Sequence, residues 1–383
     1  MEQRKDLLYV IGFTSVLGIL SLLFLILPKQ AFSEMENRSL QAAPILSWER
    51  IWSSKFAGDA ELFITDHFPF RNEWVAGKSA LEQLRLQQEN NGIYKGKDGY
   101  LFEKFAEPDY DKLSQYADAV KQFAANNKEA NFTFMLSPNS IGLYPDRLPW
   151  LAQAYAQTNV NDYVSKQIGN DISFLNGSDF LKPAAEDDKP IFYRTDHHWT
   201  SYGSYLAYAA YAKSMGWKPM SEQQFRVRTV TDSFLGSLHT RSQFSSISPD
   251  SIEIYEPKQQ VSTEVYIADT DTTMSGLYDE SFLDKKDKYS YFQGGVHALM
   301  KLRSELAPGK KADLSKLLVV KDSYAHSLLP FLTSHVEEIH VIDVRYYNGS
   351  VSNYIKENAI EDVLLLFNTS TFVTEQNLLK LKY

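Results

Sequence analysis

The stretch TDHHWTSYG, from Thr195 to Gly203, gathers an aspartate, two adjacent histidines and a tryptophan ahead of an amphipathic helical pattern. Asp196 and His198 are separated by one residue, so in an extended backbone their side chains point the same way and that of His197 faces away. A carboxylate beside an imidazole fixes the tautomer of the ring. The pair could therefore activate a nucleophile that lies elsewhere in the chain.

The nucleophile must be a residue other than cysteine, because the sequence contains none. The segment KLLVVKDSYAHSLLP, from Lys316 to Pro330, offers Ser323 between a strand-like apolar run and an apparent helix. Reactive groups in open α/β sheets collect at the carboxyl ends of strands. On such a turn Ser323 can use its own backbone N–H and that of Tyr324 as oxyanion donors near a helix N-terminus.

Simpler interpretations of both segments stay open. Thr195 or Asp196 could cap an ordinary helix, and Ser323 could cap another, because these residue types are favoured there. Adjacent histidines and an aspartate could also ligate a divalent ion. Consecutive side chains diverge, however, and no HExxH pattern follows, so we predict no metal site and no cofactor.

Several neighbouring residues could assist such a site. His326 is the alternative base nearest to Ser323, although we expect it to pack in the core. His297 follows two glycines in a loop and could contact substrate, and Trp199 could line the substrate groove. Lys321 could attract an anionic substrate, although we expect it to lie at the edge of the sheet.

The elements that must position these residues are buried strands. Continuous apolar runs separated by helical or loop stretches are typical of parallel sheets covered by helices on both faces. We therefore predict an α/β fold, a three-layer sandwich with a mostly parallel sheet. Residues 222–300 alternate polar and apolar residues instead, which indicates a β-rich insertion. The apolar runs are NFTFML (131–136), LLVV (317–320), IHVIDVR (339–345) and DVLLLFN (362–368).

Charge and hydropathy bound the location of the protein. With 39 basic and 48 acidic residues the net charge is −9, which argues against a nucleic-acid partner. The segment Leu7–Leu27 has no charged residue and reaches the length of about 20 residues that spans a bilayer. Ala31-Phe32-Ser33 offers a cleavage pattern, but we expect an uncleaved anchor. Arg4 and Lys5 favour an amino terminus in the cytoplasm and a body outside.

These patterns divide the chain into three parts. We expect a cytoplasmic stub and transmembrane anchor over 1–33, a helical connector over 34–92, and a catalytic domain over 93–383 that contains the β-rich insertion. No internal repeat is present.

Two of these motifs together resemble a known family. Asp196-His197-His198-Trp199, followed by Thr200 and Gly203, resembles the DHHW family of bacterial membrane-anchored proteins. With KDSYA at 321–325 it is also similar to the SGNH-hydrolase-like domain of alginate O-acetyltransferase proteins. The serine usually precedes the Asp/His block in that superfamily, whereas here it follows. Further segments match in family order: ENRSLQAAP (36–44), DHFPFR (66–71), GKDGYLFE (96–103), SPNSIGLYPDRLP (137–149), FQGGVH (292–297) and LLLFNTSTF (364–372).

The resemblance implies Ser323 as nucleophile, His198 as general base and Asp196 as the carboxylate that orients it. It also implies O-acetylation of a cell-surface or secreted polysaccharide outside the cytoplasm, with the acyl group supplied by a membrane-bound O-acyltransferase. For such a substrate Trp199 could line a sugar-binding groove and Lys321 could attract an anionic glycan. The glycine that usually precedes Asp-Ser is Lys321 here, and no clear G-x-N-D block supplies the second oxyanion donor. Asn139 and Asn368 are candidates for that donor, because each follows a buried strand and carries a side-chain amide.

Two other functions fit the same residues. An esterase or deacetylase acting on polysaccharide would share the triad, since only the final acceptor differs. A non-catalytic glycan-binding or scaffold protein would keep the triad as a hydrogen-bonded strut.

Overall fold

The structure is a computed structural model that describes residues 2–33, 38–85, 87–186, 189–259 and 261–383. It divides into two compact units, one of Met1–Asn90 with Thr240–Ser246 and the other of Asn91–His239 with Ile247–Tyr383. Glu36 and Asn37, which begin the ENRSLQAAP segment, lie outside the described residues.

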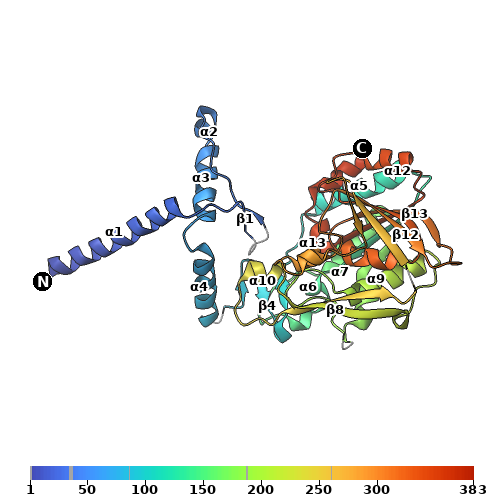
Figure 1. Cartoon of the computed structure of the whole chain (residues 1–383), viewed down its shortest axis with the longest axis horizontal. Helices are drawn as coiled ribbons and strands as arrows, with labels where there is room; N and C mark the ends of the chain where they lie inside the picture. The colour runs from blue at the N-terminus through green and yellow to red at the C-terminus, as the bar shows by residue number, and fades with distance from the viewer. Residues whose placement is uncertain (1, 34–37, 86, 187–188, 260) are drawn as a thin grey trace. The chain divides into compact units, whose positions relative to one another are not determined.

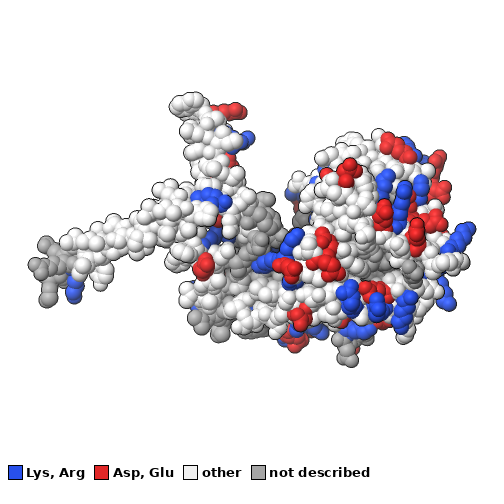
Figure 2. All heavy atoms as spheres, in the orientation of Figure 1, with Lys and Arg blue, Asp and Glu red and all other residues white. Residues whose placement is uncertain are grey.

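The first unit is helical. Helix α1 (Glu2–Ile26) is long and apolar enough over Lys5–Ile26 to cross a membrane, and none of that stretch is buried in the protein. It is the blue helix of Figure 1, and it is almost free of charged spheres in Figure 2. These properties are consistent with a single-pass anchor. The other elements are β1 (Phe32–Ser33), β2 (Arg38–Ser39), α2 (Trp48–Trp52), α3 (Lys55–Asp66), α4 (Arg71–Leu84) and β3 (Glu89–Asn90).

The second unit is built on an eight-stranded sheet with the order β11-β10-β12-β14-β13-β15-β6-β7. The strands from β14 to β7 run parallel to one another, and β12, β10 and β11 extend the sheet antiparallel on one side. The fold is therefore α/β with a mostly parallel sheet, as predicted. The strands are β6 (Asn131–Ser137), β7 (Ser173–Asn176), β10 (Val261–Ile267), β11 (Thr272–Ser275), β12 (Leu299–Leu306), β13 (Leu314–Lys321), β14 (Val336–Ile342) and β15 (Asp362–Asn368).

Helices cover both faces of this sheet. Helix α9 packs against α11, and α5 packs against α7. The β13–β14 crossover contains α11 and the β14–β15 crossover contains α12; the two run in opposite directions across the sheet, so right-handed connections put these helices on opposite faces. The β6–β7 crossover, which contains α7, runs in the same direction as that of α12, so α7 and α5 share the face of α12. Figure 1 shows α5 and α12 together, with α9 across the strands. The helices are α5 (Tyr110–Asn126), α6 (Ser140–Leu143), α7 (Gln157–Ile168), α8 (Gly177–Leu181), α9 (Ser201–Ser214), α10 (Ser237–Ser242), α11 (Ala325–Leu332), α12 (Val351–Asn358) and α13 (Thr369–Phe372).

The β-rich segment expected at 222–300 is divided between two sheets. Strands β8 (Phe225–Phe234) and β9 (Asp250–Pro257) pair only with each other in a separate antiparallel ladder within the described chain. Strands β10, β11 and the first residues of β12 join the main sheet. A short hairpin of β4 (Ile93–Lys95) and β5 (Leu101–Glu103) precedes α5.

Candidate active site

The motif segment forms a tight loop rather than a strand or a helix start. Phe192 and Trp199 form an isolated antiparallel bridge, and the N–H of Tyr193 donates to the carbonyl of His198 at 3.2 Å. Helix α9 begins afterwards, capped by the hydroxyl of Thr200, which accepts from the N–H of Gly203 at 3.2 Å. Thr195 and Asp196 therefore do not cap this helix.

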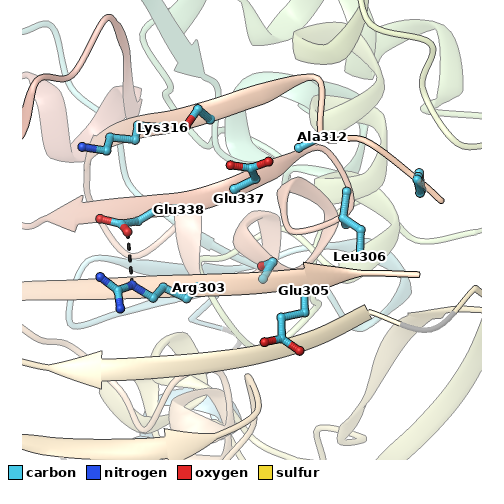
Figure 3. A pocket seen from close by; sticks show the side chains of 10 residues that line it. Arg303, Glu305, Leu306, Ala312, Lys316, Glu337 and Glu338 are labelled. Atoms are coloured by element: carbon cyan, nitrogen blue, oxygen red, sulfur yellow. Dashed lines mark hydrogen bonds and ion pairs between the residues drawn. The ribbon is translucent and has the colours of Figure 1, made fainter. Parts of the chain in front are cut away.

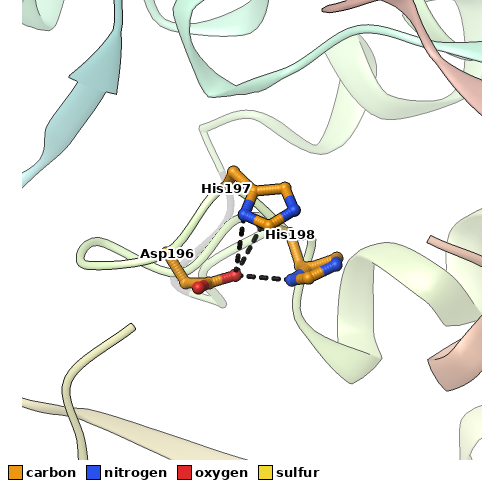
Figure 4. A group of neighbouring side chains, drawn as sticks. All are labelled: Asp196, His197 and His198. Carbon is orange, nitrogen blue, oxygen red and sulfur yellow. Dashed lines mark hydrogen bonds and ion pairs between the residues drawn. The ribbon is translucent and has the colours of Figure 1, made fainter. Parts of the chain in front are cut away.

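Asp196 is held in place by hydrogen bonds to both of its oxygens. Its Oδ1 lies 2.6 Å from Nδ1 of His198 and accepts the His198 backbone N–H at 2.9 Å. Its Oδ2 accepts the N–H of Ser237 at 2.7 Å. Gly236 permits this approach, since a Cβ there would lie 2.3 Å from Cβ of Asp196. Figure 4 shows Asp196 beside the two imidazoles, with one carboxylate oxygen directed at both residues.

Ser323 meets the same imidazole from the other side. It lies on the turn between β13 and α11, at the carboxyl end of an interior parallel strand. Its Oγ is 2.7 Å from Nε2 of His198, within the reach that proton transfer requires. Asp196 and His198 are buried, at 3% and 5% exposure, whereas Ser323 is half-buried. The structure thus brings together Ser323, His198 and Asp196, with the hydroxyl as the most accessible member.

Asp322 fixes the turn that carries the serine. Its Oδ1 accepts the N–H of Tyr324 at 2.8 Å, and its Oδ2 accepts both the backbone N–H and the side-chain amide of Asn368 at 2.7 Å. The N–H of Tyr324 is thereby occupied. Within the described ranges the N–H of Ser323 has no hydrogen-bond acceptor, so it is the backbone donor available beside the hydroxyl.

The surroundings set the charges of the pair. Burial by itself raises the pKa of Asp196, but His197, His198 and the N–H of Ser237 outweigh it and hold that pKa well below its usual range. Burial, followed by the neighbouring His197, lowers the pKa of His198 to about 4 against the opposing effect of Asp196. Above that pH the carboxyl is ionised and the imidazole is neutral, which is the state in which the ring can accept a proton.

His197 does not face away as an extended backbone would require. Its ring centroid lies 3.8 Å from that of His198, and its Nδ1 is 2.6 Å from Oγ of Ser237. The reason is the loop conformation, because strict alternation of side chains holds only in a strand. Both histidines therefore lie at the site.

The two asparagines proposed as oxyanion donors lie close together at the ends of β6 and β15. The Nδ2 of Asn139 donates to the hydroxyl of Tyr324 at 2.9 Å and to Oδ1 of Asn368 at 3.1 Å. The Nδ2 of Asn368 donates to Asp322 and, at 2.7 Å, to the hydroxyl of Thr371. In this conformation both amides support the serine turn instead of pointing free N–H groups at a substrate.

Two aromatic candidates are structural supports of the same turn. Trp199 has no exposed surface, and its Nε1 donates to the carbonyl of Tyr324 and to Oγ of Ser327, both at 3.0 Å. Tyr324 is also fully buried, and its hydroxyl donates to the carbonyl of His197 at 2.6 Å. Neither ring has surface on which a sugar could stack.

The remaining charged candidates lie around the turn. Lys321 is fully buried on an interior strand, not at the sheet edge, and its Nζ lies 3.0 Å from Oδ2 of Asp343 and 2.8 Å from Nε2 of His326. Burial lowers its pKa, although Asp343 opposes this.

His326 is packed in the core, as expected. His297 contacts the carbonyl of Gln293 at 3.1 Å. Among the described residues, neither His326 nor His297 forms a hydrogen bond with the Ser323 hydroxyl.

Sequence reasoning missed three contributors. The ring of Tyr289 stacks on His198, with centroids 3.8 Å apart and planes 11° apart. Ser237 binds Asp196 and His197, as described above. Asp250 accepts from the N–H and hydroxyl of Thr195 at 2.8 and 2.7 Å, which anchors the start of the motif loop. All three come from the segment between α9 and β12, where no motif marks them.

Asp196, His197 and His198 also offer ligand atoms that lie within 4.8 Å of one another. Both ring nitrogens of His198 are hydrogen-bonded, one to Asp196 and one to Ser323. An ion bound to that ring would have to displace one of these partners. The donor set therefore fits a proton relay better than a metal centre.

A groove of about 410 Å³ lies away from this site. It is lined by the second half of β12 from Arg303 on, by Lys316 in the first half of β13 and by Glu338 in the first half of β14, with an Arg303–Glu338 ion pair at 3.1 Å (Figure 3). Since Ser323 follows the carboxyl end of β13, this groove is at the opposite end of the strands. It cannot hold a substrate for the serine.

The comparisons with known proteins agree with this architecture. The family model of DHHW proteins matches residues 155–342. A DHHW family protein from Eubacterium siraeum has a similar structure, with a TM-score of 0.66 and 24% identity over 77% of this chain and 96% of that one. The structure of Bacillus cereus PatB1 with a sulfonyl adduct is similar too, with a TM-score of 0.63 and 18% identity over 76% of this chain and 100% of that one. A second structure of Bacillus cereus PatB1 has a TM-score of 0.63 and 19% identity over 73% of this chain and 96% of that one. No curated protein sequence matches the chain.

The predicted resemblance to DHHW proteins is confirmed in sequence over the matched residues and in fold over about three quarters of the chain.

Proposed function

We propose that this protein is a membrane-anchored O-acetyltransferase-like enzyme that acylates hydroxyl groups of a cell-surface or secreted polysaccharide. The observation that carries the proposal is the continuous hydrogen-bonded chain from the half-buried Oγ of Ser323 through His198 to the buried Asp196. A neutral imidazole between a hydroxyl and an ionised carboxylate is the arrangement that activates serine for acyl transfer.

In the first step His198 accepts the proton of Ser323 while Oγ attacks the carbonyl carbon of an activated acyl donor. The N–H of Ser323 is the donor available to the developing oxyanion. Collapse of the tetrahedral intermediate breaks the bond to the leaving group, which takes the proton from His198. An acyl-serine remains.

In the second step an acceptor hydroxyl gives its proton to His198 and attacks the acyl carbon. The acceptor oxygen forms the new ester bond as the bond between the acyl carbon and Oγ of Ser323 breaks. The proton passes from His198 to Oγ of Ser323, which restores the serine hydroxyl. Transfer requires that the acceptor occupy the place that water would otherwise take. Water in the same place would make the protein an esterase.

We infer the location of the reaction from α1. With this helix in a bilayer and its basic amino end in the cytoplasm, the second unit works outside, close to the membrane. A membrane-bound O-acyltransferase is the partner that could pass an acyl group to it there, as the resemblance implies. The acceptor would be a polysaccharide at the cell surface.

PatB1, which shares the fold, has been solved with a sulfonyl adduct. Sulfonyl fluorides react with activated hydroxyl groups, so a sulfonyl fluoride is a suitable probe for Ser323. We would treat the full-length protein in detergent with phenylmethanesulfonyl fluoride and follow the increase in protein mass. We expect one adduct in the wild type and in the control Ser233→Ala, which removes an exposed hydroxyl from β8, and none in Ser323→Ala. Equal labelling of Ser323→Ala and Ser233→Ala would contradict the assignment of Ser323 as the nucleophile.

The same preparations then separate transfer from hydrolysis. Each is incubated with p-nitrophenyl acetate, with and without a hexose oligosaccharide. Acetylated sugar that disappears in Ser323→Ala supports an acetyltransferase. Release of acetate that no acceptor alters supports an esterase.

A further inference from the structure

A second hollow opens at the same end of the sheet as Ser323. It has a volume of about 620 Å³ and lies between the β5–α5 connection, the start of α13 and the motif loop. We call it the connector groove. Its lining residues include the segment Glu103–Asp109, the hydroxyl residues Ser370, Thr371 and Thr374, and also Asn368 and His197.

His197 joins this groove to the triad. Its Nδ1 binds Oγ of Ser237, and its carbonyl accepts the hydroxyl of Tyr324, so the ring is fixed. Its side chain is 31% exposed, and among the described residues its Nε2 has no hydrogen-bond partner. Figure 4 shows that nitrogen directed away from Asp196. A fixed imidazole thus offers one free ring nitrogen at the groove.

The distances connect the groove to the reacting atoms. The ring of His197 lies 3.8 Å from that of His198, which in turn is 2.7 Å from Oγ of Ser323. A hydroxyl oxygen that accepts from Nε2–H of His197 would keep its own proton for the neighbouring ring of His198.

The groove walls favour one class of acceptor. The lining residues include three with carboxylates, Glu103, Glu107 and Asp109, and two with ammonium groups, Lys104 and Lys112. Lys112 is already 3.5 Å from Asp109, so its charge is partly matched. A chain of uronic acids would bring further carboxylates against this surface, whereas hydroxyl and amide groups can bond to it.

We propose that the connector groove binds the acceptor glycan and that His197 is a positioning residue that holds the acceptor hydroxyl beside the acyl-serine. The acceptor is an uncharged or amino-bearing oligosaccharide, not a polyuronate. This inference rests on the proposed transferase function and names the substrate class of that site.

The test uses the full-length protein with two independent readouts. Labelling of Ser323 by phenylmethanesulfonyl fluoride reports the nucleophile and its base and needs no acceptor. Acetyl transfer from p-nitrophenyl acetate reports the groove. The acceptors are an oligomer of N-acetylglucosamine, its deacetylated form and an oligogalacturonate.

The first variants change His197. His197→Ala should lower transfer to the N-acetylglucosamine oligomer about tenfold more than it lowers the labelling rate, because transfer also loses one hydrogen bond of roughly 1.4 kcal/mol. His197→Gln keeps a polar group at the same reach and should restore most of the transfer. An equal loss of labelling and transfer in His197→Ala would mean that His197 acts only through His198, and would overturn the inference.

The second variants fill the groove without touching the triad. Thr374→Trp puts a large ring at an exposed position of the wall and should lower transfer at unchanged labelling. Its matched control is Thr273→Trp, an exposed threonine on β11, which should change neither. Unchanged transfer in Thr374→Trp, or a wild type that prefers the oligogalacturonate or acetylates no sugar, would overturn the inference. A wild type that is not labelled at Ser323 would instead refute the proposed function itself.

Discussion

The ring of Tyr289 lies flat against the imidazole of His198, with centroids 3.8 Å apart and an angle of 11° between the planes. The hydroxyl of Tyr289 lies 3.2 Å from that of Ser327, and the ring is buried. The stacked ring therefore blocks rotation of the imidazole about its side-chain bonds, while Asp196 sets its tautomer. Tyr289 and Asp196 therefore control different properties of the same imidazole, its orientation and its tautomer.

Tyr289→Ala should free the imidazole to rotate and lower the labelling rate of Ser323 by roughly tenfold to a hundredfold, because a small misplacement of a catalytic group is costly. Tyr289→Phe keeps the stacking ring and loses only the hydroxyl, so it should label within about threefold of wild type. Stopped-flow or mass-spectrometric labelling measures both. A phenylalanine variant as slow as the alanine variant would show that the hydroxyl, not the ring, is what matters.

Asp196→Asn should lower acetyl transfer and serine labelling by roughly 1,000- to 10,000-fold, because the neutral amide no longer selects the tautomer that leaves Nε2 free for Ser323. Asp232→Asn, at an exposed position of β8, is the matched control and should leave the rate unchanged. A loss of less than about fivefold in Asp196→Asn would exclude Asp196 from the role proposed here.

The rate of serine labelling should depend on pH through His198. The base must be neutral, and its pKa is lowered to about 4, so labelling should rise with pH through that value and stay level between pH 5 and pH 8. Lowering the pH protonates the ring and stops the reaction. The rate is measured on protein shown to be folded by circular dichroism at each pH. A midpoint near 6.5, the ordinary value for histidine, would contradict the lowered pKa.

Gly236→Ala should move Asp196, since the added Cβ would lie 2.3 Å from Cβ and 2.4 Å from Oδ2 of that residue. We expect a loss of about 1–3 kcal/mol in the free energy of unfolding and a slower labelling of Ser323. The control is Gly77→Ala in α4, where nothing lies within 4 Å of the added group. That change should be neutral or slightly stabilising, because alanine favours helix. Chemical denaturation measures the free energy of unfolding of both variants. An unchanged value in Gly236→Ala would mean that the loop around Gly236 can move away from Asp196 without cost.

The central sheet could be predicted because its strands are marked by composition. The segment Asp362–Asn368 is buried at every position, and a short continuous apolar run is typical of a parallel strand that is covered on both faces. The same logic located Ser323, since the end of a buried strand followed by a helix is a recurrent position for reactive groups. His198 and Asp196 could be paired from their spacing in the chain.

Other features could not be read from the chain because they depend on tertiary contacts. The environment of Trp199 is one case, since its type allowed a sugar platform and only packing shows a fully buried support. Tyr289 is another, because it reaches His198 from a short 3-10 helix over Lys288–Tyr291 that no local pattern ties to the site. The position of His197 required the loop conformation, which alternating geometry does not describe.

Asp322 gives the turn that carries Ser323 a rigidity that Asp196 and His198 do not provide. Through three hydrogen bonds its carboxylate ties the turn after β13 to the end of β15, so the backbone around Ser323 cannot open unless two neighbouring strands separate. The amide protons of Tyr324 and Asn368 should therefore exchange with solvent only when the whole sheet unfolds. Local fluctuations would then be left to the side chains and loops above the serine, and the thermal stability of the core would determine how long the reaction centre stays intact.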